Sequence, residues 1–560
     1  MQENQPRDQD AFAADDADTA TIRKARGAFF TPPAIARFMT DWALRDARDT
    51  VLEPSCGDAE FLVHAVRRLT ALGARRPAVA GVEIHAHSAD AARARVAHAG
   101  GRPDIQTSDF FAVAAGDERG YDAVVGNPPY VRSQNWSGEP RDRSRSAARA
   151  AGVELSASAS SWAAFTAHAT SFLAPGGRLA FVLPAELLSV NYAAAVRRFL
   201  YEKFSSVDLV AFDDRVFAEA EVDVVLLLVD GYGQGPAEHI TVHRARNAVA
   251  LDRELPAQKW TPSDPSAKWT PALLPSEGLA AYAAAAGFTR LEEWGDTTLG
   301  TVTGNNNFFA LSPARAAELG LDSADLLPLS PPGSGHLRGL DLAVDALAAL
   351  GRSGARTLLF RPAAEPSGAA RAYIAEGQDT GVSRAYKCRV RATWWRVPLL
   401  APADLLITAM NADTARITSN EAGAHHLNSV YGIYLNEDHR DLGRELLALA
   451  SLNSVTLLGA EVVGRAYGGG ILKLEPREAD ALPVPGPALV AAVARELSAA
   501  RAEVALLLDA RRLLDAVAVI DRILLVDGLG MSDSDVRVLR AAHAVMSRRR
   551  RGRGKGAETS

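Results

Sequence analysis

The sequence contains little cysteine, no long uncharged apolar run and little net charge. Two cysteines, Cys56 and Cys388, are too few for a disulfide framework and indicate a reducing, cytoplasmic compartment. No apolar stretch reaches the ~20 uncharged residues of a transmembrane helix. The polar, acidic stretch 1–20 is unlike a signal peptide. We therefore expect a cytoplasmic protein that makes no membrane contact and binds no metal.

The net charge of −6 does not by itself indicate a nucleic-acid-binding protein, but the basic residues are clustered. Phosphate binding depends on such local patches more than on the total charge. One cluster has aromatic residues interleaved and no acid: Arg384, Tyr386, Lys387, Arg389, Arg391, Trp394, Trp395 and Arg396. A second comprises Arg141, Arg143, Arg145 and Arg149, and a third is the tail 548–555. We interpret the first two as nucleic-acid contacts and the tail as solvated surface.

Apolar runs of β character alternate with helical segments through the first 245 residues. The expected strands are Val51–Leu52, Val79–Ile84, Tyr121–Val125, Arg178–Leu183 and Val222–Val229, and Ala59–Leu72 is an expected helix. Near-continuous runs of Val and Leu indicate parallel strands that are buried on both faces. The sequence therefore predicts a doubly wound, Rossmann-like α/β domain.

Beyond this domain the composition changes several times. Residues 290–485 have many turn residues and short alternating segments, which predicts a mixed α+β domain. Three- and four-residue apolar spacing then predicts helices. The expected organisation is a disordered tail (1–26), the α/β domain (27–245), a linker (246–289), the mixed domain (290–485), a helical segment (486–545) and a basic disordered tail (546–560).

A turn of small residues, 53–59, follows the first expected strand and precedes a helix, where a ligand can approach the backbone. It lacks the three-glycine dinucleotide fingerprint, which disfavours a nicotinamide or flavin cofactor. Its two carboxylates, Glu53 and Asp58, would repel a pyrophosphate but suit a cationic ligand. S-adenosylmethionine carries both a sulfonium and an ammonium group.

Two further acidic positions follow at intervals typical of such a site. Glu83 ends the second expected strand, where a carboxylate can accept hydrogen bonds from ribose hydroxyls. Asp109 and Phe110 offer a carboxylate for an adenine amino group and an aromatic ring to pack on it. A strand-end acid such as Glu83 can equally be structural.

Asn127-Pro128-Pro129-Tyr130 leaves the third of these strands as a loop. The Asn127 side-chain oxygen and the Pro128 carbonyl are two acceptors, and proline has no N–H to compete for them. Tyr130 offers a face against which a planar ring can stack. The pattern suits the holding of a planar amino group during attack on an electrophile, although Asn-Pro-Pro is also good turn chemistry.

These motifs and their order resemble the gamma-class DNA adenine-N6 methyltransferases of bacterial restriction–modification systems. The matching segments are 27–33, 53–62, 81–84, 109–110, 127–130 and 176–184. The resemblance is strong over residues 25–245. It extends more loosely over 300–485, where 385–398, 425–429 and 464–470 resemble elements of the family's recognition regions.

The resemblance implies an S-adenosylmethionine-dependent catalytic domain, a target-recognition domain and C-terminal helices. It implies that Thr31 and Glu53 hold the methionine moiety, with Ser55 and Gly57 lining it by backbone. Glu83 would bind the ribose, and Asp109 with Phe110 the adenine. Asn127, Pro128 and Tyr130 would act on the target base, with Phe217 as the second stacking ring. Phe217 can also be an ordinary core residue.

The implied reaction is methyl transfer to the exocyclic amino group of an adenine flipped out of double-stranded DNA. Arg384, Lys387, Arg389, Arg391 and Arg396 would contact guanine edges or phosphates. Four asparagines in this region have two interpretations, pairing with adenine or building turns, and we favour turns: Asn305, Asn306, Asn307 and Asn428. Neither cysteine suits ring-carbon cytosine methylation, because Cys56 lies in the cofactor turn and Cys388 in a basic strand-like run.

The expected partners follow from this reading. We expect a monomer or weak dimer, with any cognate restriction endonuclease on a separate chain, because neither terminal region reads as a nuclease domain of ~100 residues. Two alternatives stay open at this point. One is an N-methyltransferase that acts on RNA or a protein amide, and the other is a non-catalytic DNA-binding protein that kept the fold.

Overall fold

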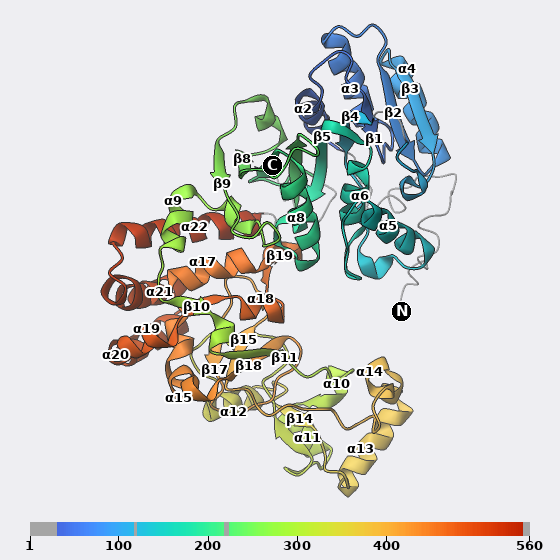
Figure 1. Cartoon of the computed structure of the whole chain (residues 1–560). Coiled ribbons are helices and arrows are strands. Elements are labelled where there is room, and N and C mark those ends of the chain that lie inside the picture. The colour runs from blue at the N-terminus through green and yellow to red at the C-terminus, as the bar shows by residue number, and fades with distance from the viewer. Residues whose placement is uncertain (1–30, 117–119, 218–222, 553–560) are drawn as a thin grey trace, which may run out of the picture. The chain divides into compact units, whose positions relative to one another are not determined.

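The computed structural model describes residues 31–116, 120–217 and 223–552, and the chain divides into two compact units. The first unit extends to Leu273 and the second is Leu274–Arg551. Both units are drawn in Figure 1. The predicted tail 1–26 lies outside the described residues.

A mixed sheet with the order β3-β2-β1-β4-β5-β7-β6-β8-β9 forms the centre of the first unit. Its strands are β1 (Val51–Glu53), β2 (Ala78–Glu83), β3 (Arg102–Thr107), β4 (Tyr121–Gly126), β5 (Leu173–Pro184), β6 (Ser206–Phe212), β7 (Val224–Asp230), β8 (Ile240–Ala245) and β9 (Ala257–Trp260). In the parallel core, Leu52 of β1 lies opposite Ala80 of β2 and Val124 of β4. The carboxyl ends of β1, β2 and β4 therefore share one edge, which is where ligands bind in such sheets.

Helices cover this sheet. They are α2 (Pro33–Ala43), α3 (Glu60–Ala71), α4 (Ala86–His98), α5 (Glu139–Ala150), α6 (Ser161–Thr170), α7 (Glu186–Ser189) and α8 (Ala194–Lys203), with short 3-10 turns at 110–112, 133–135, 191–193, 248–252 and 270–273. Helices α3 and α4 pack on β2, and α2 packs on β4 and β5 (Figure 1). Helix α6 contacts β5, helix α8 contacts β6, and the two helices contact each other.

Alternate strand residues supply the core beneath α2, α3 and α4. Val125, Val182 and Leu226 belong to one buried cluster with Met39 and Phe61 from the helices. The intervening strand residues are buried as well, as in Phe181 between Ala180 and Val182. A strand buried on both faces explains the near-continuous apolar runs, and the α/β fold expected from the sequence is confirmed.

Two details of the first unit differ from the expectation. Strand β7 is antiparallel to both β5 and β6, because an apolar run signals burial but carries no information on strand direction. Part of the expected linker 246–289 is structured: β9 pairs antiparallel with β8 at the sheet edge. Its alternating exposure suits an edge strand, which the polar composition concealed.

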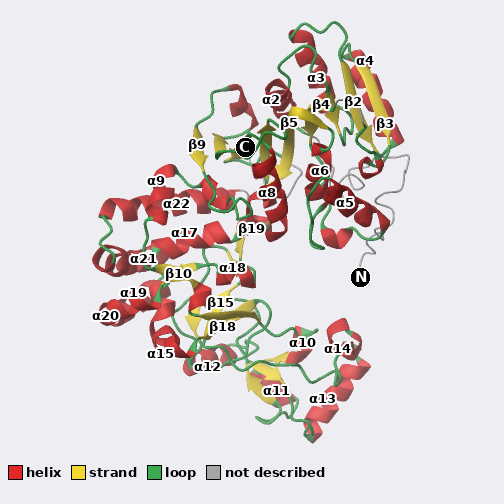
Figure 2. Cartoon of the chain, in the orientation of Figure 1, coloured by secondary structure: helices red, strands yellow, loops and turns green. Residues whose placement is uncertain are grey.

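The second unit combines short strands and short helices (Figure 2). Its sheets have the orders β10-β21, β11-β18-β15-β17, β12-β14-β13 and β16-β20-β19. The strands are β10 (Phe288–Arg290), β11 (Gly295–Leu299), β12 (Ala310–Leu311), β13 (Leu326–Pro328), β14 (Leu358–Phe360), β15 (Leu405–Thr408), β16 (Met410–Asn411), β17 (Ile417–Ser419), β18 (Val430–Leu435), β19 (Arg465–Tyr467), β20 (Ile471–Lys473) and β21 (Pro483–Pro485). The helices before residue 485 are α9 (Ser276–Ala283), α10 (Asn306–Phe309), α11 (Pro313–Glu318), α12 (Val344–Arg352), α13 (Gly368–Asp379), α14 (Tyr386–Arg389), α15 (Arg440–Leu442), α16 (Ala448–Ala450), α17 (Ser454–Val463) and α18 (Pro476–Asp480).

Helices end the described chain: α19 (Pro487–Ala492), α20 (Ala494–Asp509), α21 (Leu513–Asp521), a π-helical turn (522–528) and α22 (Asp533–Gly552). The expected disordered basic tail 546–560 is therefore wrong for 546–552, which continue α22. Arg550 is buried there, with Nη2 2.8 Å from a carboxylate oxygen of Glu461 on α17. A run of arginines looks solvated in sequence, but the buried partner is 89 residues away. Residues 553–560 lie outside the described part.

Within the described residues, no single helix is both long and apolar enough to cross a membrane. One bent pair, 437–450 with 454–463, meets the criterion by length and composition alone.

Candidate active site

The loop after β4 holds Asn127 by both ends of its amide. The Asn127 Nδ2 group donates to Thr31 Oγ1 at 3.2 Å, and the hydroxyl of Tyr130 lies 2.7 Å from Asn127 Oδ1. The Tyr130 hydroxyl is also 2.9 Å from the carbonyl oxygen of Val182 on β5. Burial raises the pKa of Tyr130 well above its usual range, so the phenol stays protonated and can donate. The amide of Asn127 thus has one defined orientation.

Serine side chains hold the backbone on either side of Pro128. Ser55 Oγ donates to the carbonyl of Asn127 at 3.4 Å, and Ser161 Oγ donates to the carbonyl of Pro129. Ser161 Oγ also accepts from the N–H of Val131 at 2.8 Å. Among the described residues, the Pro128 carbonyl itself accepts no hydrogen bond. Two acceptors of this loop, the Asn127 side chain and the Pro128 carbonyl, therefore remain usable by a ligand.

Two aromatic residues accompany the loop. Phe217 is 6% exposed and belongs to the core cluster against which the half-buried Tyr130 packs. Phe217 is thus buried in this structure, in the cluster against which Tyr130 packs.

Two buried carboxylates shape the turn between β1 and α3. Glu53 ends β1, and its Oε2 accepts from the N–H of Leu62 at 3.3 Å. The two carboxylate oxygens of Glu83 accept from the N–H groups of Gly57 at 2.9 Å and His85 at 3.0 Å. Glu83 therefore fixes the turn through two backbone N–H groups.

The backbone of this turn takes up left-handed geometry. Gly57 has a φ of 51° and Ala59 a φ of 67°, and α3 begins immediately after Ala59. Glycine adopts this conformation freely, whereas alanine does so seldom, so the surrounding contacts must enforce it. Such conformations are common where a backbone is shaped for a ligand.

The acidic groups make the turn suited to a cation. Burial raises the pKa of Glu53 well above its usual range, and the nearby carboxylates of Asp58 and Glu83 raise it further. A positively charged ligand would relieve this unfavourable ionisation. The residues present therefore fit a ligand that carries a sulfonium and an ammonium group.

The Asp109 turn is held by a residue that the sequence reading assigned elsewhere. Asp109 Oδ1 accepts from the N–H of Phe111 at 3.0 Å, and Oδ2 forms an ion pair with Arg143 of α5 at 2.9 Å. The ring of Phe110 is 3% exposed and stacks on Phe165 at a centroid distance of 5.3 Å. The expectation that the Phe110 ring packs on a ligand needs correction, because that ring is packed within the protein and the half-buried ring at this turn is Phe111.

The arginine cluster that follows the loop forms contacts within the first unit. Arg143 pairs with Asp109 and Glu139, and Arg149 with Glu154. Arg141 and Arg145 donate to the carbonyls of Ala157 and Leu155, respectively. The interpretation of this cluster as a nucleic-acid patch is not supported, since its guanidinium groups have protein partners.

In the second unit, the basic–aromatic segment is a short helix, α14, with irregular flanks. Cys388 is fully buried in it, which corrects the expectation of a strand. Four of the five predicted DNA-contacting cations are exposed: Arg384, Lys387, Arg389 and Arg396.

The fifth cation, Arg391, has an internal role. Its Nη2 donates to the carbonyls of Val302 at 2.7 Å and Thr303 at 2.8 Å, and its Nη1 to that of Trp394 at 3.3 Å. Desolvation lowers the pKa of its guanidinium. Arg391 therefore ties α14 to the 302–307 loop, and the prediction of a DNA contact there needs correction.

Sequence reasoning missed three supporting residues: Ser161, Arg143 as the partner of Asp109, and Thr31 as the partner of Asn127. Thr31 and Asn127 are 96 positions apart, and Ser161 and Pro129 are 32 apart. A serine that begins a helix gives no sequence signal of the loop it will hold, so only the fold reveals these contacts.

Two family models match consecutive parts of the chain. A model described as N-6 DNA Methylase matches residues 17–256, and one described as the C-terminal domain of the Type II methyltransferase M.Eco57I matches residues 266–525.

Individual relatives show the same similarity. The chain is 27% identical over 493 residues to the Type II methyltransferase M.XamI of Xanthomonas campestris pv. amaranthicola, covering 82% of this chain and 85% of that protein. It is 21% identical to M.AccI of Acinetobacter calcoaceticus, covering 81% of this chain and 84% of that protein.

A solved structure shares the fold. The Type IIL restriction-modification enzyme MmeI, solved in complex with DNA, aligns with a TM-score of 0.59 and 14% identity over 89% of this chain and 73% of that one. The two family models, the two methyltransferase relatives and the motif order identify the chain as a member of the gamma-class, site-specific adenine-N6 DNA methyltransferases of restriction–modification systems.

Proposed function

We propose that the Asn127–Tyr130 loop holds the exocyclic amino group of a flipped adenine during methyl transfer. The observation that supports this most strongly is the orientation of the Asn127 amide, whose nitrogen is bound by Thr31 and whose oxygen is approached by Tyr130. The carbonyl of Pro128, which no described residue bonds, offers a second acceptor beside it.

The chemistry of the amino group explains why two acceptors are needed. The nitrogen lone pair of an adenine amino group is delocalised into the ring, which makes it a poor nucleophile. Asn127 Oδ1 would accept one amino hydrogen and the Pro128 carbonyl the other, favouring a tetrahedral nitrogen with an available lone pair. Positioning and preorganised dipoles then supply most of the rate.

The methyl donor that fits the first unit is S-adenosylmethionine, which supplies an electrophilic methyl group on a sulfonium. Glu53 and Thr31 would lie at its methionine moiety, with the backbone of Ser55 and Gly57 alongside. Glu83 would accept from its ribose hydroxyls. For the adenine ring of the cofactor, we propose contacts with the Asp109 carboxylate and the backbone of Phe110, since the Phe110 ring is packed inside the protein.

Base flipping is required because a stacked adenine cannot enter such a loop. Unstacking costs a few kcal/mol, which contact with aromatic rings offsets in part. We propose Tyr130 as one stacking ring and Phe217 as the other. Their membership of one packing cluster supports this pairing.

We further propose that double-stranded DNA is recognised by the second unit, with residues 290–485 as the recognition domain and 27–245 as the catalytic domain. The exposed cations Arg384, Lys387, Arg389 and Arg396 would contact phosphates. A cognate endonuclease would be a separate chain, because the relatives named as methyltransferases are matched over most of their own length. We propose that a monomer or weak dimer acts on the DNA.

Methylated-base sequencing of DNA from a host that expresses the protein, and lacks other methyltransferases, tests this function. The expected product is N6-methyladenine within one short sequence. The matched control is a host that expresses the Asn127→Ala variant, which should leave that sequence unmodified. Methylation of cytosine, or methylation without sequence preference, would contradict the proposal.

A further inference from the structure

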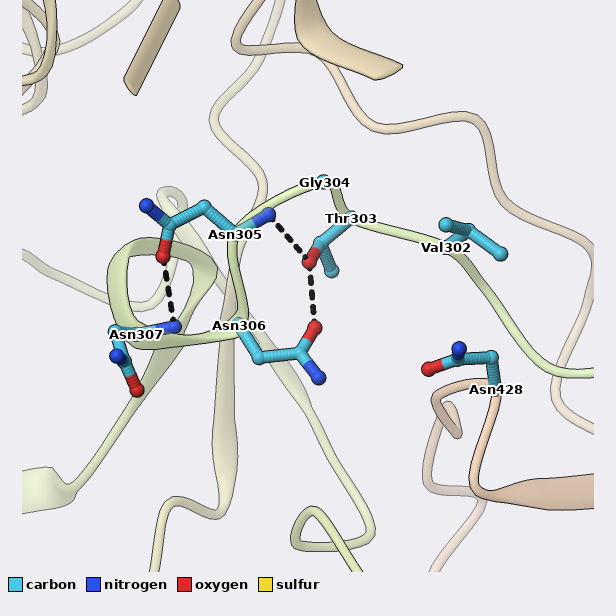
Figure 3. Close-up of a pocket in the computed structure, with 7 residues that line it drawn as sticks. All are labelled: Val302, Thr303, Gly304, Asn305, Asn306, Asn307 and Asn428. Atoms are coloured by element: carbon cyan, nitrogen blue, oxygen red, sulfur yellow. Dashed lines mark hydrogen bonds between the residues drawn. The ribbon is translucent and has the colours of Figure 1, made fainter. Parts of the chain in front are cut away.

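An amide-lined pocket of about 310 Å³ lies in the second unit (Figure 3). It is formed by residues 302–305, which precede α10, by the first two residues of α10, Asn306 and Asn307, and by Asn428. The segment 302–307 is firmly supported: Phe308, directly after it, stacks on Tyr373 with a centroid distance of 4.3 Å. Arg391 binds the carbonyls of Val302 and Thr303 from the other side. The pocket is therefore part of a packed structure.

Two of its asparagines build the loop, as the sequence reading favoured. Asn305 Oδ1 accepts from the N–H groups of Asn307 at 3.0 Å and Phe308 at 3.2 Å, which caps the short helix. Asn307 Oδ1 accepts from Arg356 Nη1 at 2.7 Å. These oxygens are occupied by contacts inside the protein.

Asn306 differs because its amide is oriented toward a ligand. Thr303 Oγ1 accepts from the N–H of Asn305 at 3.2 Å, so its hydroxyl hydrogen is free to donate, and it donates to Asn306 Oδ1 at 2.6 Å (Figure 3). One lone pair of the Asn306 oxygen is thereby used, and the orientation of the amide is fixed. Among the described residues the Asn306 Nδ2 group has no acceptor, so it presents its N–H donors in a fixed direction.

Asn428 faces this donor across the pocket in Figure 3. Its side chain is exposed, and no described residue bonds either its oxygen or its nitrogen. An unrestrained asparagine amide can present a donor or an acceptor by rotation. The pocket therefore combines one fixed donor with one adaptable group.

We infer that this pocket reads the major-groove edge of a purine in the recognition sequence, an assignment that rests on the proposed function. Both purines carry the N7 acceptor, which matches the fixed Asn306 donor. At position 6, guanine has an acceptor and adenine a donor, and Asn428 can pair with either. Thymine offers one acceptor and cytosine one donor, so neither matches both amides with the same geometry.

Phosphate is the other acceptor in DNA, but the pocket has features of base reading. Its lining groups are neutral amides, whereas phosphate contacts rely mainly on cations. Cations lie close by: a Cβ placed on Gly304 would be 3.1 Å from Lys387 Cβ, so the loop and α14 are in contact. The exposed residues Arg384, Lys387 and Arg389 would then hold the backbone while the pocket contacts a base.

The test uses the full-length enzyme with duplexes that contain its recognition sequence, as found by methylated-base sequencing. Each non-target purine is replaced in turn by its 7-deaza analogue, which removes the N7 acceptor but keeps base pairing. We expect one position at which the replacement lowers kcat/KM by about 10-fold or more. Insensitivity at every purine would overturn the inference, whereas failure to methylate any DNA would instead overturn the proposed function.

Two variants assign the contact to these residues. Asn306→Ala should lose most of its sensitivity to the 7-deaza analogue at that position, while Gln378→Ala, an exposed amide on α13 outside the pocket, should keep it. Asn428→Asp offers acceptors only, so it should penalise guanine relative to adenine at that position by about 10-fold. If Asn306→Ala keeps the 7-deaza sensitivity, or instead weakens binding to all sequences and lowers its salt dependence, the pocket contacts phosphate and the inference is wrong.

Discussion

The hydroxyl of Tyr130 lies 2.7 Å from the side-chain oxygen of Asn127, so one residue of the loop orients another that is three positions away. Tyr130 then has two separable functions: its ring can stack on the target base, and its hydroxyl orients the acceptor of the amino group. Tyr130→Phe keeps the ring and should lower kcat by about 10-fold, the effect of one hydrogen bond. Tyr130→Ala removes both functions and should lower kcat by about 100-fold or more. Single-turnover methylation with a defined duplex measures both, and equal losses in the two variants would show that the hydroxyl alone matters.

The contact between Thr31 and Asn127 makes a second prediction. Thr31→Val has the same shape but cannot accept from Asn127 Nδ2, so the amide loses one of the contacts that set its orientation. At saturating S-adenosylmethionine we expect kcat to fall by about 10-fold, because the amide is less well oriented, and we expect cofactor binding to weaken as well, because Thr31 is proposed to lie at the methionine moiety. Thr31→Ser is the matched control and should stay close to wild type. A wild-type kcat at saturating cofactor in Thr31→Val, with weaker cofactor binding measured by calorimetry, would show that Thr31 acts on the cofactor alone and does not orient Asn127.

The raised pKa of Glu53 predicts how cofactor binding depends on pH. Folding raises this pKa, so Glu53 stabilises the ligand-free protein most below its unfolded-state pKa, and this stabilisation is lost as pH rises through the folded-state pKa. A cationic cofactor favours the ionised form, so its binding should strengthen as pH rises through that same range and should release a proton. Calorimetry in two buffers of different ionisation enthalpy measures that proton. Glu53→Gln should bind the cofactor more weakly at neutral pH and release no proton from this site.

The buried ion pair between Arg550 and Glu461 predicts a large effect of Arg550 on stability. Its guanidinium donates to Glu461 through Nε and Nη2, and the two side chains are 4% and 3% exposed. Arg550→Met would leave the Glu461 carboxylate buried and unpaired, which costs about 3–5 kcal/mol. Urea denaturation should show this loss, and Arg548→Ala, an exposed arginine on the same helix, should unfold like wild type. Unchanged stability in Arg550→Met would mean that the end of α22 is not packed as described.

The exposed cations near α14 predict a salt-dependent effect. Arg389→Ala or Arg384→Ala should weaken binding to all DNA sequences by a similar factor and reduce the slope of log affinity against log salt by about 0.9 per phosphate contact. Arg391→Ala should act mainly on stability, because its guanidinium binds three carbonyls inside the protein. Fluorescence anisotropy across a salt series separates the two cases. A lower salt slope with unchanged stability in Arg391→Ala would assign it to DNA.

The catalytic fold was largely predictable from sequence, because its strands are buried on both faces and its ligand turns carry distinctive residues. The direction of β7 was not, since Val and Leu report burial without direction. The edge strand β9 was not predicted either, because its composition is polar and an edge strand needs only one apolar face. In the site, the positions of Asn127, Glu53 and Glu83 follow from the motifs.

The supporting contacts were beyond sequence reasoning. Arg143 looked like a DNA contact in a run of arginines, yet it pairs with Asp109, and Arg391 looked similar to Arg389 although only one of them is exposed. Charge patterns show that cations are present, but the partner of each is chosen by the fold. The same limit applied to Arg550, whose carboxylate partner lies on another helix.

The central claim is that Asn127 acts on the amino group of the target adenine and does not serve to bind the cofactor or to fold the loop. Single-turnover transfer of a labelled methyl group to the cognate duplex, measured for Asn127→Ala beside calorimetry of S-adenosylmethionine binding, tests it most directly. We predict a rate at least about 100-fold lower with cofactor affinity within a factor of about three of wild type. A wild-type transfer rate in Asn127→Ala, or a loss explained entirely by weaker cofactor binding, would contradict the claim.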